Sequence, residues 1–171
     1  MALKIAGLLT VLCVCTAAGL MKSAVLSKRV RQLEGFVGAL EAISSDIRYF
    51  ASPVDVLMRK IDSLPEYREL LLFGLCAGEL AHSRDLQKAW EKALQSARPR
   101  LALDDGDIET LTWFGRVLGT TDVEGQTASC ERYAALLRQR LESARRDRQS
   151  RGRLYTSLGL LTGIFVCVVF I

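Results

Sequence analysis

Charge is confined to the middle of the chain, and this distribution constrains the fold more than any other feature. All 19 acidic residues and all but one of the 23 basic residues lie between Lys22 and Arg153; the exception is Lys4. The uncharged runs on either side cover 17 residues (5–21) and 18 residues (154–171). Each run is just long enough to cross a hydrocarbon core about 30 Å thick as an α-helix. The sequence therefore predicts a transmembrane helix in 1–22, a folded domain in 23–153 and a second transmembrane helix in 154–171.

The basic residues beside these runs predict the orientation of the chain. Four of them follow the first run and five precede the second: Lys22, Lys28, Arg29 and Arg31, then Arg145, Arg146, Arg148, Arg151 and Arg153. Basic residues that flank membrane helices stay on the cytoplasmic side. We therefore expect a two-pass protein of the cell membrane with a cytoplasmic central domain. The basic collar before the second run, 138–153, is expected to contact anionic lipid.

Each predicted membrane segment also has one alternative interpretation. A cleaved secretory signal peptide is the alternative for the first, because Lys4, an apolar stretch and small residues at 16–18 fit its outline. The basic residues after the run disfavour export of the central domain, so an uncleaved anchor is preferred. In the second segment, Gly159 and Gly163 form a GxxxG pair that lets another helix approach closely. We predict a helix-packing face there, with ordinary membrane composition as the alternative.

The central domain is predicted to be an all-α bundle of about six helices. Apolar residues repeat every three or four positions at Val30, Leu33, Val37, Leu40, Ile43, Ile47 and Phe50, and no alternating strand pattern of similar length occurs. Further helices are expected at about 53–63, with Pro53 in the first turn, at 65–80, at 86–96 after an Asp85 cap, and at 108–118. In the last helix, Thr127, Cys130, Ala134, Leu137, Leu141 and Ala144 form a narrow packing seam. Because only Gly152 interrupts it, this helix is expected to continue into the second membrane segment.

An acidic cluster precedes the fifth helix and has two interpretations. Asp104, Asp105, Asp107 and Glu109 are spaced loosely like a calcium loop, but Gly106 is misplaced for that motif and no bidentate glutamate is found at the required distance. Carboxylates at a helix N-terminus accept hydrogen bonds from free backbone N–H groups. The sequence therefore favours helix capping over metal binding.

No residue pattern in the domain is typical of an enzyme, a cofactor site or a nucleic-acid interface. Residues 22–153 carry 22 basic and 19 acidic residues, a nearly balanced surface. Phosphate loops, nucleophile motifs and paired cysteines are missing, and Cys76 and Cys130 are interpreted as packed thiols. Two acid–base pairs are conceivable, Glu41 with Asp46 and Glu79 with His82. Each lies among ordinary helix charges, so we predict no catalysis, no metal and no cofactor.

Several segments resemble the stage III sporulation protein AB family, which is similar to the F-type inner-membrane platform proteins of type II secretion. They are Arg31-Gln32-Leu33, the stretch Ala89-Trp90-Glu91-Lys92-Ala93-Leu94, the run from Phe114 to Gln126, and Tyr155 with Leu158-Gly159. The part from Leu118 to Gln126 is the most specific, because helix packing alone does not require its glycines, aspartate and glutamine. The segment Phe50-Ala51-Ser52-Pro53-Val54-Asp55 departs from the family pattern, which puts any contact made by that turn in doubt.

The resemblance implies a structural platform in a channel-like complex between mother cell and forespore. Its expected partners are a secretion-type ATPase of the stage III sporulation protein AA type and other membrane components, with the domain on the mother-cell side. A platform in general type II secretion or pilus assembly is the alternative, since it would share the fold. Gly119, Asp122, Gly125 and Gln126 are expected to form a corner between two helices, with Asp122 as N-cap, and secondarily a partner contact.

Overall fold

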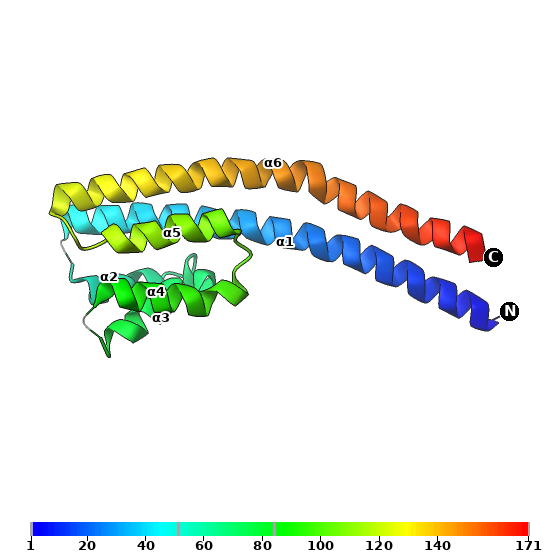
Figure 1. Cartoon of the computed structure of the whole chain (residues 1–171), viewed down its shortest axis with the longest axis horizontal. Coiled ribbons are helices and arrows are strands. Elements are labelled where there is room, and N and C mark those ends of the chain that lie inside the picture. The colour runs from blue at the N-terminus through cyan, green and yellow to red at the C-terminus, as the bar shows by residue number, and fades with distance from the viewer. Residues whose placement is uncertain (1, 51, 84, 171) are drawn as a thin grey trace. The chain divides into compact units, whose positions relative to one another are not determined.

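The computed structural model describes the backbone of residues 2–50, 52–83 and 85–170, and the side chains of residues 14, 17–50, 52–83, 85–150 and 157. Within these ranges the chain forms six α-helices and two 3₁₀ turns and has no strand (Figure 1). The helices are α1 (Ala2–Tyr49), α2 (Val54–Ser63), α3 (Leu72–Leu80), α4 (Leu86–Ala97), α5 (Asp105–Val117) and α6 (Val123–Phe170), with 3₁₀ turns η1 (Arg68–Leu70) and η2 (Arg98–Arg100). The predicted all-α fold is confirmed.

The chain divides into two compact units, and α1 and α6 contribute to both. Unit 1 consists of Met1–Val30 and Ser143–Ile171, and unit 2 consists of Arg31–Glu142. The predicted domain boundaries after residues 22 and 153 fall within the uninterrupted helices α1 and α6. The expected continuation of the last helix into the C-terminal segment is therefore seen, whereas the domain boundaries themselves stay predictions.

Unit 1 is built from the first part of α1 and the last part of α6. Its described side chains include Leu20, Met21 and Val25, all exposed. The predicted membrane segments, with Gly159 and Gly163, lie largely outside the residues whose side chains are described. In the part that is described, no helix carries an apolar stretch of the length that crosses a membrane.

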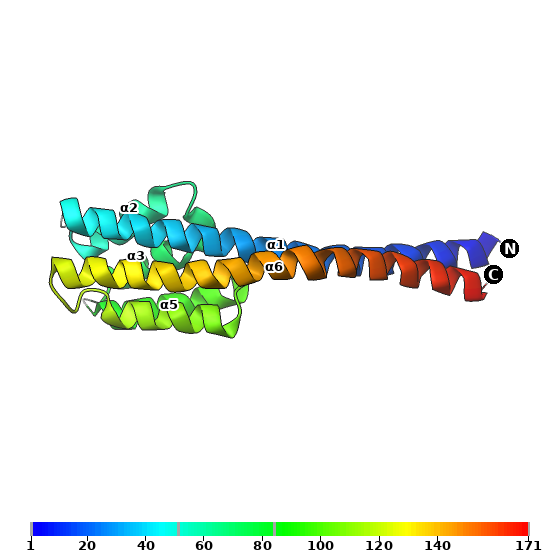
Figure 2. The same cartoon turned by 90° about the horizontal axis from the view of Figure 1, so that it is seen from above.

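Unit 2 is a bundle of two helical layers. The parts of α1 and α6 that belong to it lie side by side with α5, and α2, α3 and α4 form the second layer (Figures 1 and 2). The neighbours α1 and α6 are joined by ion pairs of opposite polarity, Arg48–Glu131 at 2.8 Å and Glu41–Arg138. Glu41 and Arg48 are seven residues apart on α1, and their partners are seven residues apart on α6 in the reverse order. This is the spacing expected for two antiparallel helices.

A series of aromatic rings connects five helices through the core of unit 2. Neighbouring rings lie 5.4–6.1 Å apart between centroids, within the range of favourable aromatic contacts. The series consists of Phe36 on α1, Phe73 on α3, Trp90 on α4, Phe114 on α5 and Tyr133 on α6. All but Tyr133 are fully buried, and aliphatic side chains such as Leu33, Leu40 and Met58 fill the space around them. The core therefore depends on residues from almost the whole length of unit 2.

The predicted helix 65–80 is wrong in one respect, because it is divided at Leu71. Leu71 has a left-handed backbone (φ 61°) that separates η1 from α3. The division lets Leu70 pack against α1 at Gly35 while Leu72 enters the core of the second layer. The sequence does not predict this break, because Leu70, Leu71 and Leu72 are identical residues with the same helix propensity.

The end of the first long helix also differs from prediction. The predicted apolar face is buried from Val30 to Ile47, but Phe50 is 69% exposed. The reason is that α1 ends at Tyr49, so Phe50 already belongs to the turn toward α2. Pro53 is the N-cap of α2 and lies one position before its first turn.

Other local predictions are confirmed. Asp85 caps α4 by accepting a hydrogen bond from the Lys88 backbone, and α4 ends at Ala97, before the 3₁₀ turn that contains Pro99. Asp104 and Asp107 form a reciprocal capping box at the start of α5, so capping accounts for the acidic cluster. All six residues of the predicted α6 seam are buried.

Candidate partner-binding end of the bundle

Three of the five connections in unit 2 lie at one end of the bundle. They join α1 to α2, α3 to α4 and α5 to α6 (Figure 1). We call the described residues within 49–56, 80–86 and 118–124 the end surface. Connections carry the residues that regular helix packing leaves free, so such a surface is a natural place for contact with other molecules.

The corner between α5 and α6 contains all four residues that were predicted to form a helix corner and a partner contact. After α5, Gly119 adopts a positive φ of 78°, a conformation that glycine tolerates without steric cost. Asp122 then starts α6 by accepting a hydrogen bond from the Gly125 backbone at 2.9 Å. The predicted helix stop and the predicted N-cap are therefore both present.

The side chain of Gln126 forms hydrogen bonds to two backbone groups of this corner. Its Oε1 accepts a hydrogen bond from the Gly119 backbone at 3.3 Å, and its Nε2 donates to the Thr121 carbonyl at 2.8 Å. One amide thus satisfies a donor and an acceptor in a turn that lacks regular backbone pairing. Gln126 has a structural role, and its half-exposed position leaves part of the side chain accessible.

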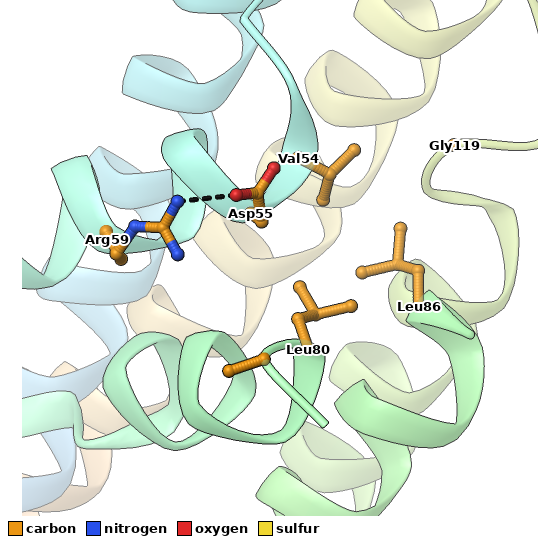
Figure 3. Close-up of a pocket in the computed structure, with 7 residues that line it drawn as sticks. Val54, Asp55, Arg59, Leu80, Leu86 and Gly119 are labelled. Carbon is orange, nitrogen blue, oxygen red and sulfur yellow. Dashed lines mark hydrogen bonds and ion pairs between the residues drawn. The ribbon is translucent and has the colours of Figure 1, made fainter. Parts of the chain in front are cut away.

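An open groove of about 500 Å³ lies on the end surface, where the three connections meet. Figure 3 shows Val54, Asp55 and Arg59 of α2 facing Leu80, Leu86 and Gly119 across it. Ala81 completes the lining. Gly119 is the only one of the four predicted contact residues that lines the described groove. The other lining residues were missed because they come from connections far apart in the sequence.

Four exposed apolar side chains belong to the same end surface. Tyr49 and Phe50 at the end of α1 are 72% and 69% exposed, and Val56 and Val123 are each 43% exposed. Phe50 is held from one side by the Lys60 ammonium group, which lies 4.7 Å from the ring centroid. Exposed apolar groups that gather in one place are typical of protein-contact surfaces.

A partly buried ion pair holds the turn that presents Phe50. Asp46 is 3% exposed and accepts a hydrogen bond from Lys60. Burial would raise the pKa of Asp46, but hydrogen bonds from Lys60 and Ser52 and the charge of Lys60 outweigh it, and the pKa is lowered. Its second oxygen, Oδ2, is buried with no hydrogen-bond partner among the described atoms. The pair fixes the path from α1 into α2.

Two of the four described acidic residues on the end surface form ion pairs within the chain. Asp55 pairs with Arg59, and Asp85 pairs with Lys88 at 3.0 Å. On the α6 side, Asp122 caps the helix and Glu124 is exposed in its first turn. Arg84 lies outside the described residues. The described charges that are left over at this end are acidic.

The described side chains at this end are suited to binding, and the candidate acid–base groups of the bundle are engaged in other contacts. The acidic members of the two conceivable acid–base pairs are engaged elsewhere: Glu41 with Arg138, Asp46 with Lys60 and Glu79 with Lys92. The ring of His82 lies 3.0 Å from the Gly78 carbonyl. Burial raises the pKa of both Cys76 and Cys130 to about 12, which keeps these thiols protonated at neutral pH. Across the described residues, no three metal-ligating side chains come together.

Comparison with known proteins matches the chain to one family along nearly its whole sequence. The model of the stage III sporulation protein AB family matches residues 4–171. Stage III sporulation protein AB of Bacillus subtilis (strain 168) is 24% identical over 172 residues, which cover 98% of each chain. A solved structure of a stage III sporulation protein AB superposes with a TM-score of 0.63 at 24% identity, covering 71% of this chain and 96% of that one. With nearly its whole length matched, the chain belongs to the stage III sporulation protein AB family.

Proposed function

We propose that the chain is a structural membrane platform of a secretion-like channel complex between mother cell and forespore. The observation that carries this proposal is the family match, which runs from residue 4 to residue 171 and so includes both uncharged ends as well as the bundle. A protein that keeps this three-part organisation along its whole length is suited to hold a cytoplasmic domain at a membrane. Membership in the family supports a role in sporulation.

The proposed topology has two membrane passes and a cytoplasmic bundle on the mother-cell side. It is supported by the basic residues that flank both uncharged runs on the side of the bundle. The arginines of the collar 138–153 would meet anionic headgroups, which attract basic residues next to a membrane helix. Gly159 and Gly163 would provide the face on which the two membrane helices pack.

The bundle is proposed to couple a secretion-type ATPase to the membrane components of the complex. In this role the platform hydrolyses nothing and transmits motion through its helices. The corner residues Gly119, Asp122, Gly125 and Gln126 would contribute to the contact, since Gly119 and Asp122 are exposed on the end surface and the half-exposed Gly125 and Gln126 follow in the first turn of α6. A platform for general type II secretion or pilus assembly would share this fold, and we keep it as the alternative.

Deletion of the gene separates these two functions. We expect the loss of heat-resistant spores with normal vegetative growth and normal export. Normal spore counts with impaired export would contradict the sporulation role and favour the general secretion platform. Complementation with the intact gene is the control for effects on neighbouring genes.

The topology has its own test, which uses a new cysteine in place of the buried ones. Cys76 and Cys130 are buried and protonated, so they should not react with an impermeant maleimide in the folded protein. Ala135 is exposed on α6, and an Ala135→Cys chain should be labelled only after the membrane is permeabilised. Labelling in intact cells beyond that of the unsubstituted chain would place the bundle outside, as a cleaved signal peptide requires.

A further inference from the structure

The connection between α2 and α3 rests on the first helix through two side chains. We call this connection, residues 64–71, the strap; it contains the 3₁₀ turn η1. A Cβ added at Gly35 of α1 would lie 3.2 Å from the side chain of Leu70. One added at Gly38 would lie 3.0 Å from the hydroxyl group of Tyr67. Because Gly35 and Gly38 are one turn apart, they form a single seat for the strap on one face of α1.

The contact between the strap and this seat depends mainly on one buried side chain. Leu70 is 2% exposed, whereas the ring of Tyr67 is only half-buried. The backbone amides of Tyr67, Leu70 and Leu71 donate hydrogen bonds to carbonyl groups of the strap itself, at 3.0–3.3 Å. Four of the eight strap residues are exposed. Lifting the strap off α1 therefore costs about the burial of one or two side chains, far less than unfolding the bundle.

Leu71 stores backbone strain while the strap is seated. Its φ of 61° is unfavourable for a residue with a Cβ. On one side of it Leu70 is buried on the seat, and on the other side Leu72 is buried in the core. When the strap lifts, the backbone of Leu71 is free to return to an ordinary conformation. The strain therefore favours the lifted state.

The helices at the two ends of the strap are held together by a contact outside it. Asp62 of α2 lies against Gly74 in the first turn of α3, where an added Cβ would lie 2.6 Å from the Asp62 Oδ1 atom. Ile61 and Phe73, next to these two residues, are buried in the core. The strap can therefore lift as a loop while α2 and α3 stay packed.

We propose that the strap is a conformational device that lifts off the seat at Gly35 and Gly38, with Leu71 as its hinge, while the rest of the bundle stays folded. Lifting removes one of the contacts that join the second layer to α1, the helix that continues into the first uncharged run. The inference goes beyond the platform function, because it concerns an equilibrium within the bundle and requires no partner.

Thiol labelling of the full chain in lipid nanodiscs tests the lifting of the strap. Leu70 and Leu72 are both buried and flank the hinge, so a cysteine at each position compares the strap with the core. We expect Leu70→Cys to be labelled at least about tenfold faster than Leu72→Cys, because local opening is more frequent than global unfolding. The native buried thiols of Cys76 and Cys130 report opening of the whole bundle in the same chain, and mass spectrometry identifies each labelled position. Equal labelling rates at the two new cysteines would overturn the proposal.

The hinge is tested by two further substitutions in the Leu70→Cys chain. Leu71→Gly relieves the strain of the seated strap and Leu71→Ala keeps it, so the glycine chain should be labelled roughly fivefold more slowly. Equal or faster labelling of the glycine chain would contradict the role of Leu71 as a strained hinge. Hydrogen exchange at the Leu70 amide repeats the comparison in chains that keep Leu70, and again the glycine chain should be the slower. This second measurement decides if rapid labelling of Cys76 shows that Leu70→Cys unfolds the bundle.

Discussion

The indole of Trp90 donates a hydrogen bond to the Leu111 carbonyl at 3.0 Å and lies directly over Gly115 on α5. Trp90 is 1% exposed, so this bond satisfies a polar group that would otherwise be buried without a partner. The contact is possible only because Gly115 has no side chain, since a Cβ there would overlap the indole ring. Close approach of α4 and α5 thus depends on one tryptophan and one glycine.

Gly115→Ala should therefore destabilise the bundle by about 1–3 kcal/mol, because the indole must move out of its packed position. Thermal and chemical unfolding of the full chain in detergent would measure the change. Gly78→Ala is the matched control, because no heavy atom lies within 4 Å of the added Cβ on helix α3. That control should gain up to about 1 kcal/mol from higher helix propensity. Equal stability of the two variants would contradict the packing argument.

Leu71 provides a test of backbone strain. Its φ of 61° costs a residue with a Cβ about 1–2 kcal/mol, and glycine avoids this cost. Both Leu71→Gly and Leu71→Ala remove the half-exposed side chain, so their difference isolates the backbone. We expect the glycine variant to be more stable than the alanine variant by about 1 kcal/mol in chemical unfolding. An alanine variant as stable as the glycine variant would mean that the turn relaxes.

The two ion pairs between α1 and α6 can be tested by reversing their charges and measuring the stability of the bundle. Glu41→Arg with Arg48→Glu would place like charges opposite Arg138 and Glu131, and we expect a loss of about 1–2 kcal/mol. Adding Arg138→Glu and Glu131→Arg restores both pairs in reversed polarity and should recover most of the loss. Unfolding at low and high salt measures the effect, which salt should reduce. A fourfold variant as unstable as the twofold one would show that the pairs do not interact.

The lowered pKa of Asp46 predicts that the stability of the bundle depends on pH. Because its pKa is lowered in the folded state, its charged form stabilises the fold above the pKa of the unfolded chain, and this stabilisation is lost as the pH falls through the folded-state pKa. Asp46→Asn should therefore lose about 1–3 kcal/mol at pH 7, with a difference from wild type that shrinks below about pH 4. Glu109→Gln, at an exposed site, is the control. A difference that stays constant with pH would contradict the role of the Asp46 charge.

A substitution of Gln126 distinguishes a structural role of this residue from a role in assembly of the complex. Gln126→Ala removes both hydrogen bonds of the corner and should cost about 1 kcal/mol without unfolding the domain. If the corner also contacts a partner, recovery of the ATPase with the membrane protein should fall, and spore counts with it. Gln139→Ala, on an exposed part of α6, is the control. Wild-type recovery of the ATPase by the Gln126 variant would leave this residue with a structural role alone.

The local parts of this fold are predictable from the sequence, and the parts that join distant segments are not. The α6 seam and the caps at Asp85, Asp104 and Asp122 arise from helix periodicity and from hydrogen bonding at helix ends. The break at Leu71 arises because tertiary packing pulls two neighbouring leucines in different directions, which no local pattern shows.

In the candidate site too, the local part is predictable from the sequence and the part that joins distant segments is not. The corner was predictable because its glycines, aspartate and glutamine are close together in the chain. The groove is formed where three connections meet, so its lining residues, such as Leu80 and Leu86, are ordinary helix-end residues until the bundle brings them together. The periodicity of α1 predicts that Phe50 lies in the core, because it gives no sign that the helix stops one residue before it.

The aromatic series through the core also has a consequence for synthesis of the chain. Phe36 belongs to the first helix, whereas Tyr133 belongs to the last, so the packed core is incomplete until nearly the whole domain has left the ribosome. At roughly 5–20 residues per second, the apolar face of α1 waits for several seconds before α6 can cover it. During that interval the nascent chain exposes a hydrophobic surface beside an N-terminal apolar run, and early delivery to a membrane or binding by a chaperone would protect both.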